Sequence, residues 1–166
     1  MKKAQAEQIF IYMLVIILAG GILLFGYNAI KNFTKQAEDV SYVKFKETIE
    51  RDFRDIATDY GTVKIKTYEI GARYKQACFV DELLIAGKGK IGTADYSAVL
   101  SQYPIILDAI TTGTKYDLFL VPGEKQIDLG IVKVNDPKLF VCFNLTNGRF
   151  TIRMEGTGSS TVVTNS

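Results

Sequence analysis

The stretch over residues 9–30, IFIYMLVIILAGGILLFGYNAI, restricts what this chain can fold into more than any other part of it. It has 22 residues and no charge, and Asn28 is its only clearly polar member. At ~1.5 Å per residue, a helix of this length crosses a hydrocarbon core of about 30 Å. A secretory signal has a shorter apolar core of roughly 7–15 residues, and a helix buried in a soluble domain carries polar breaks on one face. We therefore predict a transmembrane helix, with a cleaved signal and a core helix as the alternatives.

The helix is expected to continue well beyond this stretch. Neither glycine nor proline occurs over residues 27–60, so the first stop signal is Gly61. Apolar residues recur here at steps of three and four, which is the spacing of an amphipathic helix. They are Tyr42, Phe45, Ile49, Phe53, Ile56 and Tyr60. This stripe predicts packing against the chain's own domain, and the alternative is a coiled-coil or filament-core contact.

Beyond Gly61 the hydrophobic period becomes that of β-strands. Apolar and basic residues alternate, which predicts a half-buried strand with Val63 and Ile65 inside and Lys64 and Lys66 on a basic outer face. Further short apolar runs, separated by glycine, proline and asparagine, predict more strands of the same kind. About 105 residues follow Gly61, which is enough for one small domain with its own core.

Two local signals predict particular elements in the second half of the chain. Pro104 is expected to open a short helix that Gly113 closes. Asn147-Gly148 lies between two strand-like runs and is the strongest hairpin signal in the sequence. We therefore predict an α+β protein in which a long N-terminal helix, transmembrane and then amphipathic, packs on a small antiparallel β-sheet head.

Five segments follow from this interpretation. They are a basic N-terminal tail over 1–8, a transmembrane helix over 9–30, an amphipathic helix continuing it over 31–60, an antiparallel β-rich head over 61–155, and a flexible C-terminal tail over 156–166. The last segment, GTGSSTVVTNS, is small and polar, so we expect it to be frayed or to form an edge strand.

The N-terminal residues MKKAQAEQ carry a family resemblance. Lys3-Ala4-Gln5-Ala6 reads basic, small, glutamine, small, and Glu7 follows two residues after Gln5. With the apolar stretch behind it, this motif resembles the class III signal peptide of archaeal type IV pilin-like proteins. The resemblance covers about the first 30 residues and implies that a membrane peptidase cuts after Ala4. The alternative is an uncleaved signal anchor with an ordinary basic flank.

The same resemblance implies a fold and a function. Pilin-like proteins have a long helix carrying a β-sheet head, which is the arrangement expected for this chain. The implied function is that of a surface filament subunit or minor pilin, which sits in membrane lipid before assembly and packs its apolar helix against other subunits afterwards. The alternative is a single-pass membrane protein whose β-rich head binds a partner or ligand without assembling.

Two pairs of residues are candidate modification sites. Cys78 and Cys142 lie in apolar runs, and they are either two buried small residues or a disulfide formed on an oxidising side of the membrane. Asn32 and Asn144 each begin an N-x-[ST] motif, which matters only if the domain lies outside the cell.

The distribution of positive charge bears on orientation. Lysines precede the apolar stretch at positions 2 and 3 and follow it at 31, 35, 44 and 46. By the positive-inside rule, the larger number of lysines after the stretch favours a cytoplasmic domain. Long folded domains, however, cross membranes largely regardless of charge. The resemblance implies the opposite orientation, with the N-terminus cytoplasmic and the head extracytoplasmic, and we adopt that as the expectation.

Little in the sequence indicates chemistry. The chain has no histidine, the commonest general base and metal ligand, and its 20 basic and 18 acidic residues give no case for nucleic acid.

The motif over 87–93, GKGKIGT, fits G-x-G-x-x-G without a βαβ unit, so a flexible loop is favoured over a phosphate site. The acidic pairs Asp81-Glu82 and Asp52 with Asp55 are expected on the surface, and the serines 41, 97 and 101 have no activating base. We expect no enzyme, no cofactor and no metal site.

Overall fold

The computed structural model describes residues 2–91, 94–96, 100–123 and 125–164, and the side chains of these except at 2–9, 32, 34, 35, 91, 94 and 95. It shows an α+β protein with a long N-terminal apolar helix and a β-rich domain, as the sequence predicted. The chain divides into two compact units, Met1–Val40 and Ser41–Ser166.

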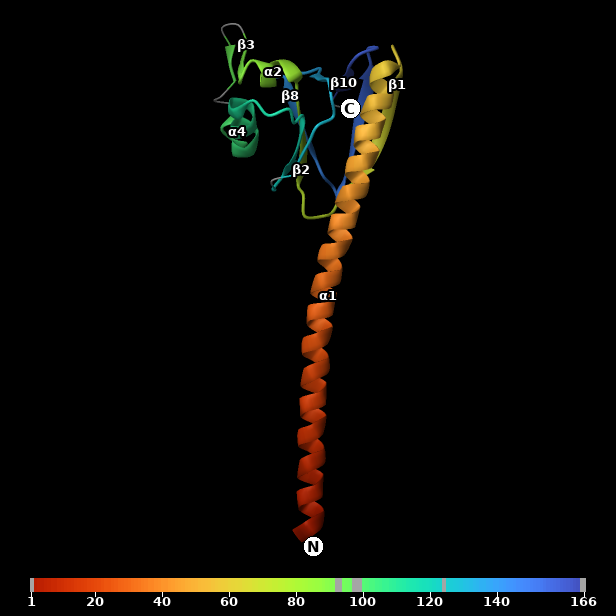
Figure 1. Ribbon diagram of the computed structural model, residues 1–166, viewed down its shortest axis with the longest axis vertical. Helices are drawn as coiled ribbons and strands as arrows, with labels where there is room; N and C mark the ends of the chain where they lie inside the picture. Colours follow the sequence, from red (N-terminus) through yellow and green to blue (C-terminus); the bar gives the residue numbers. More distant parts are fainter. Residues whose placement is uncertain (1, 92–93, 97–99, 124, 165–166) are drawn as a thin grey trace. The chain divides into compact units, whose positions relative to one another are not determined.

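The first element is the helix α1, Lys2–Thr58 (Figure 1). Within the part of the chain that the structure describes, it is the one helix long and apolar enough to cross a membrane. It ends two residues before the predicted end at residue 60, and Gly61 adopts the left-handed backbone conformation (φ 74°) that glycine accommodates best. Tyr60 therefore falls outside the helix and is 85% exposed, so its predicted place in the apolar stripe is wrong.

Within its described residues, the second unit contains two four-stranded sheets, a two-stranded pair and the short helices α2 and α4. The first sheet has the order β1-β9-β10-β7 and the second β6-β5-β2-β8. The strands of the described residues pair antiparallel, except β10 with β7, which is parallel. In chain order the elements are β1 Val63–Glu69, β2 Gln76–Val80, α2 Glu82–Ala86, β3 Lys90–Ile91, β4 Ala94–Asp95, α4 Pro104–Thr112, β5 Leu118–Val121, β6 Gln126–Ile127, β7 Val132–Val134, β8 Phe140–Asn144, β9 Arg149–Gly156 and β10 Thr161–Thr164.

The helix α4 confirms the prediction made from its two ends. Pro104 stands at the first helical position, where its missing N–H costs nothing. Gly113 closes the helix in the left-handed conformation, with φ 72°.

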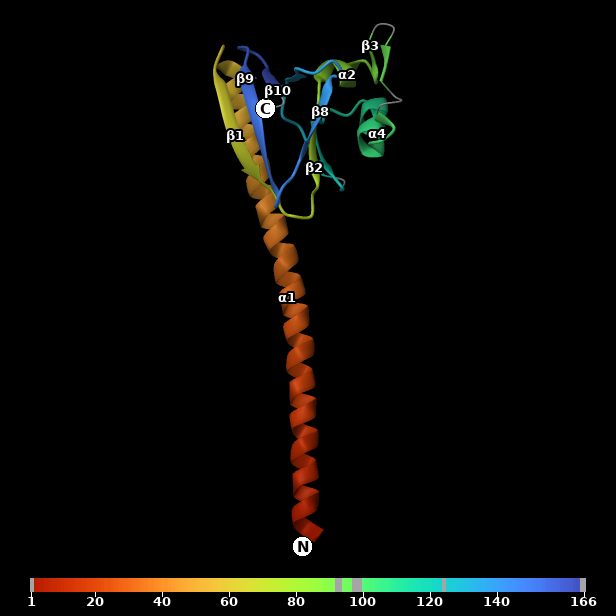
Figure 2. The ribbon, with the colours of Figure 1, turned by 180° about the vertical axis from the view of Figure 1, so that it is seen from behind.

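The main core lies between the C-terminal part of α1 and the two sheets. Four of the predicted stripe residues, Phe45, Ile49, Phe53 and Ile56, are at most 3% exposed and belong to this core. Figure 2 shows β1, β9 and β10 alongside this part of α1, and the ring of Phe53 stacks on that of Phe79 in β2 at 5.7 Å. Burying each such side chain is worth roughly 2 kcal/mol. For these four residues, packing against the chain's own domain is confirmed.

The strand β1 faces the opposite way from the prediction. Ile65 is 67% exposed, whereas Tyr68 is buried beside α1. Tyr68 packs edge-on against Phe45 of α1, with ring centroids 6.0 Å apart. Asp52 on α1 accepts hydrogen bonds from the Lys66 ammonium and from the Tyr68 hydroxyl, the latter at 2.9 Å. Burial, reinforced by this hydrogen bond, raises the pKa of the Tyr68 hydroxyl, so the hydroxyl remains a donor. Contacts of Tyr68 with both an aromatic ring and a carboxylate of the helix thus accompany the burial of this face of β1.

The predicted flexible tail over 156–166 is also wrong for the residues the structure describes. Its TVVT run forms β10, which lies between β9 and β7 inside the first sheet. Val163 is fully buried, and the Thr161 hydroxyl donates a hydrogen bond of 2.9 Å to the Phe53 carbonyl. A turn closed by the hydroxyls of Thr157 and Ser160, 2.6 Å apart, returns the chain from β9 to β10. The strand propensity of the β-branched residues in this run prevails, although small polar residues surround them.

The turn at Asn147-Gly148 forms, but it does not join two strands of one sheet. Both residues have positive φ, 52° and 73°, as a two-residue type I′ loop requires. A single bridge between Thr146 and Arg149 closes the turn, and β8 and β9 then enter different sheets. A Cβ on Gly148 would lie 2.3 Å from the Ile70 carbonyl oxygen, so only glycine fits there. The local signal predicted the turn and not the sheets that it connects.

Candidate functional site

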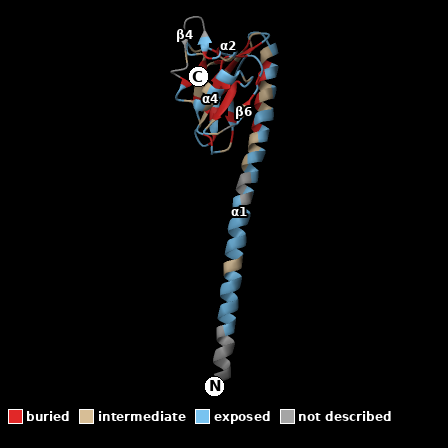
Figure 3. Ribbon diagram, turned by 60° about the vertical axis from the view of Figure 1, so that its left-hand side comes forward, coloured by how far each residue is buried: buried red, intermediate tan, exposed pale blue. Residues whose placement is uncertain are grey.

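The first unit carries a long exposed apolar surface. Over residues 10–33, every Leu, Ile, Val, Met, Phe and Tyr side chain is exposed, up to 82% at Phe25. Figure 3 shows this region almost entirely in the colour of exposed residues. Soluble monomers rarely expose contiguous apolar patches larger than a few hundred Å². An exposed apolar surface of this kind marks a site of contact with a membrane or with another protein.

The residues of the candidate processing site lie at the start of the same helix. The backbone at Lys3, Ala4, Gln5 and Glu7 is helical, and their side chains lie outside the described part of the chain. Asn32 also lies in α1 with its side chain outside that part. Cleavage after Ala4 stays a prediction.

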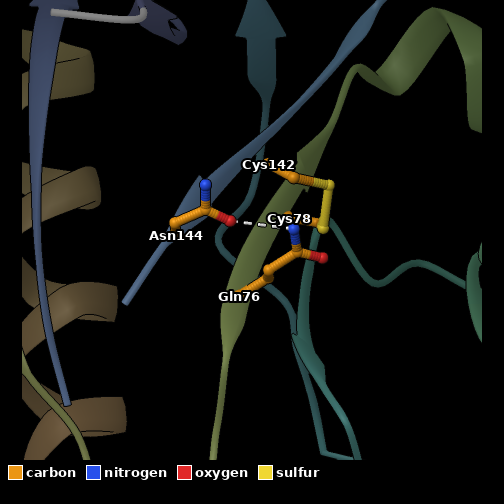
Figure 4. The surroundings of a disulfide bond; sticks show 4 residues. All are labelled: Gln76, Cys78, Cys142 and Asn144. Atoms are coloured by element: carbon orange, nitrogen blue, oxygen red, sulfur yellow. Dashed lines mark hydrogen bonds between the residues drawn. A yellow bond between two sulfur atoms is a disulfide. The ribbon is translucent and has the colours of Figure 1, made fainter. Parts of the chain in front are cut away.

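The two cysteines meet in the head. Cys78 in β2 lies directly opposite Cys142 in β8, and the two sulfur atoms form a disulfide of 2.01 Å (Figure 4). The bond joins segments that are 64 residues apart in the sequence. Cys78 is fully buried in a second core cluster, which also contains residues of α2 and α4. The disulfide therefore cross-links two neighbouring strands of the second sheet, on the side where Cys78 packs with α2 and α4.

Two aspartates of the head are buried, which the sequence did not predict. Asp81 was expected on the surface, but it is 3% exposed and accepts hydrogen bonds from the Leu83 and Val134 amides, both at 2.8 Å. Asp117 is equally buried and accepts one from the Leu129 amide at 3.1 Å. Asp81 directly follows the apolar run ACFV, and Asp117 directly precedes the apolar run LFLV. This position next to a buried strand is the sequence signal that could have predicted the burial of both aspartates. Together they hold the chain between β6 and β7.

Asp117 borders a cavity of about 530 Å³. The cavity wall also carries two further carboxylates, Glu82 and Asp128, and two lysines, Lys88 and Lys115. Burial raises the pKa of the Asp117 carboxyl to about 7, the Leu129 N–H opposes that rise, and the carboxylates of Asp128, Glu82 and Asp81 add to it. A carboxyl with this pKa changes charge near neutral pH.

Replacing Asp117 by asparagine should remove a pH dependence from the stability of the head. Because the pKa of Asp117 in the folded state, about 7, lies above its ordinary value of 3.8, the folded state holds the proton more tightly than the unfolded state. Its contribution to stability is complete below about pH 3.8 and is lost as the pH rises to about 7. Relative to wild type, we expect Asp117→Asn to gain a few kcal/mol between pH 4 and 8. Urea unfolding of the detergent-solubilised chain measures this.

The control for this prediction is Asp128→Asn, which removes a neighbouring negative charge and keeps Asp117. This variant should still lose stability as the pH rises, but the midpoint of that loss should lie at a lower pH than in wild type. The reason is that the carboxylate of Asp128 helps to raise the pKa of Asp117. A stability difference between wild type and Asp117→Asn that does not vary with pH would contradict the proposed titration.

The remaining residues weighed for chemistry do not come together. Asp52 is engaged by Lys66 and Tyr68, and no group of three His, Cys, Asp or Glu residues in the described part of the chain could hold a metal ion. Within the motif over 87–93, Lys90–Ile91 pairs with Ala94–Asp95 as a small hairpin, where a flexible loop was expected. Gly92, Thr93 and Ser97 lie outside the described residues.

The fold and the exposed segment together define a class: an α+β protein with one N-terminal helix able to cross a membrane. Comparison of the chain with protein-family models, with curated proteins and with solved structures finds no match. Function is therefore inferred from this chain's own residues.

Proposed function

We propose that this chain is a membrane-anchored surface protein, a pilin-like filament subunit or minor pilin that assembles through its apolar N-terminal helix. The observation that carries the proposal is the continuous exposed apolar surface over residues 10–33. Each large apolar side chain removed from water there is worth roughly 1.5–3 kcal/mol, so covering the segment is worth tens of kcal/mol. Lipid supplies the cover before assembly, and neighbouring copies of the helix supply it afterwards.

The small residues of the segment support close packing between helices. A Cβ added at Gly20, Gly21 or Gly26 would meet nothing within 4 Å, so these positions are open to a neighbour. In lipid, small residues let helix backbones approach closely, and packing then replaces the hydrophobic driving force. A filament core of apolar helices requires this kind of contact and no catalysis.

The disulfide supports an extracytoplasmic head. Disulfides persist in oxidising environments and are rare in the cytosol, where thiols are kept reduced. The bond between Cys78 and Cys142 therefore weighs against the orientation that the lysine count favours. In the proposed arrangement the N-terminus is cytoplasmic and the head lies outside.

A second candidate is a single-pass protein that stays in the bilayer and binds a ligand through its head. The observation that favours it is the cavity of about 530 Å³ beside Asp117, with carboxylates and lysines in its wall. In this alternative the apolar helix is an anchor only.

The N-terminus of the mature protein distinguishes the two candidates. We expect Gln5 as the first residue of the native protein, because the leader motif implies cleavage after Ala4. We also expect the protein in the material released when cells are sheared, since filaments detach in that way and single anchors do not. N-terminal sequencing of the sheared and membrane fractions provides the measurement. An intact Met1 together with complete retention in the membrane would support the anchored alternative and overturn filament assembly.

A further inference from the structure

The two N-x-[ST] motifs of the chain lie in different secondary structure. Asn144 is the last residue of β8, and Thr146 follows it before the Asn147-Gly148 turn. Asn144 and Thr146 are exposed, whereas Leu145 between them packs against the main core. Alternate residues of an extended chain lie on the same side. The amide of Asn144 and the hydroxyl of Thr146 are therefore presented together to solvent.

The motif at Asn32 lies within α1. Residues two apart on a helix do not face each other, because each residue turns the chain by about 100°. Positions 32 and 34 consequently lie on nearly opposite sides of the helix. The threonine of this motif is not positioned to act on its asparagine while the helix is intact.

The neighbourhood of Asn144 also orients its amide. Gln76 in β2 donates a hydrogen bond of 2.9 Å from Nε2 to the Asn144 Oδ1. Figure 4 shows the consequence: the oxygen of Asn144 points toward Gln76 and its nitrogen points away. The nucleophilic end of the side chain is thus the end turned from the sheet partner. The disulfide between Cys78 and Cys142, two register positions along the same strands, holds β2 and β8 together beside this pair.

We infer that Asn144 Nδ2 carries an N-linked glycan and that Asn32 does not. The co-reactant is a sugar linked through phosphate to a membrane lipid. A bond forms between Nδ2 and the anomeric carbon as the bond from that carbon to the phosphate oxygen breaks. The phosphate leaves with the electron pair, and one amide proton is lost to base. This inference rests on the extracytoplasmic head of the proposed function, since such asparagines are modified in exported proteins.

The test is mass analysis of the native protein after reduction and alkylation. Trypsin releases residues 139–149 as one peptide holding Asn144, and residues 32–35 as another holding Asn32. We expect the added mass of a sugar chain on the first peptide and none on the second. Thr146→Ala should lower the occupancy of Asn144 at least tenfold, whereas Thr146→Ser, which keeps the hydroxyl, should retain it. Thr146 is exposed, so neither change disturbs the core.

Labelling of intact cells with a membrane-impermeant amine reagent distinguishes a failure of this inference from a failure of the proposed extracytoplasmic placement. If head lysines are labelled and the peptide with Asn144 has its unmodified mass, the inference is overturned and the proposed placement stands. If the head lysines are labelled only after lysis, the extracytoplasmic placement fails, and the inference fails with it. Modification at Asn32 in place of Asn144, or equal occupancy in Thr146→Ala, would also overturn the inference.

Discussion

Arginine at both Leu18 and Ile22 should release the chain from the membrane. The two positions lie near the centre of the apolar stretch, where each arginine costs about 2.5–3.5 kcal/mol of insertion free energy. The pair therefore costs roughly 6 kcal/mol, and because the residues are four apart on α1 both charges fall on one side of the helix. The measurement is the fraction of protein that stays with membranes after extraction at alkaline pH.

A matched control places the same charges on the head. Leu83 and Ile131 are exposed apolar residues of the second unit, at 59% and 46%, so Leu83→Arg with Ile131→Arg adds two arginines without burying them. This control should remain in the membrane fraction as wild type does. Wild-type retention by the Leu18→Arg, Ile22→Arg protein would show that residues 10–33 do not anchor the chain, and would remove the main support for the proposed function.

Loss of the disulfide should be the most damaging change to the head itself. The bond closes a loop across a sequence separation of 64 residues. The chain-entropy model assigns about 4 kcal/mol to a loop of that length, because the cross-link restricts the unfolded chain. We expect Cys78→Ala with Cys142→Ala to lower the unfolding free energy of the head by about this amount. Urea unfolding of the detergent-solubilised chain, followed by far-ultraviolet circular dichroism, measures the change.

Two comparisons separate the cross-link from the loss of packing around it. Wild-type protein in reductant should lose most of the same free energy, whereas the double alanine variant should not respond to reductant. Gln76→Ala removes an exposed hydrogen bond two residues along the same strand and should cost less than about 1 kcal/mol. An unfolding midpoint of wild type that does not move on reduction would contradict a stabilising role for the bond.

The parts of the fold that the sequence predicted are those whose signal is local. The length and apolarity of residues 9–30, the spacing of Phe45, Ile49, Phe53 and Ile56, and the two ends of α4 are each contained within a short window. Helical periodicity and capping depend on neighbours three or four residues away. These predictions therefore needed no knowledge of the tertiary structure.

Several of the wrong predictions depend on distant partners. Tyr68 of β1 is buried against Phe45 and bonded to Asp52, both more than ten residues earlier in the chain, and β10 pairs with β9 and β7. The buried aspartates are likewise explained by partners far along the chain, such as the Val134 amide for Asp81. No periodicity within a single segment contains this information. For the same reason, the sequence identified both N-x-[ST] motifs but could not distinguish them.

The place of β10 in the first sheet makes folding of the head depend on a segment far along the chain. The strand lies between β9 and β7, and Thr161 hydrogen-bonds to the backbone of Phe53, more than a hundred residues earlier. The first sheet therefore cannot close until β10 has been synthesised, whereas the helix over residues 9–30 needs no later segment in order to form. A copy that ends before β10 keeps an open sheet and an exposed apolar core, which makes it a substrate for proteolysis.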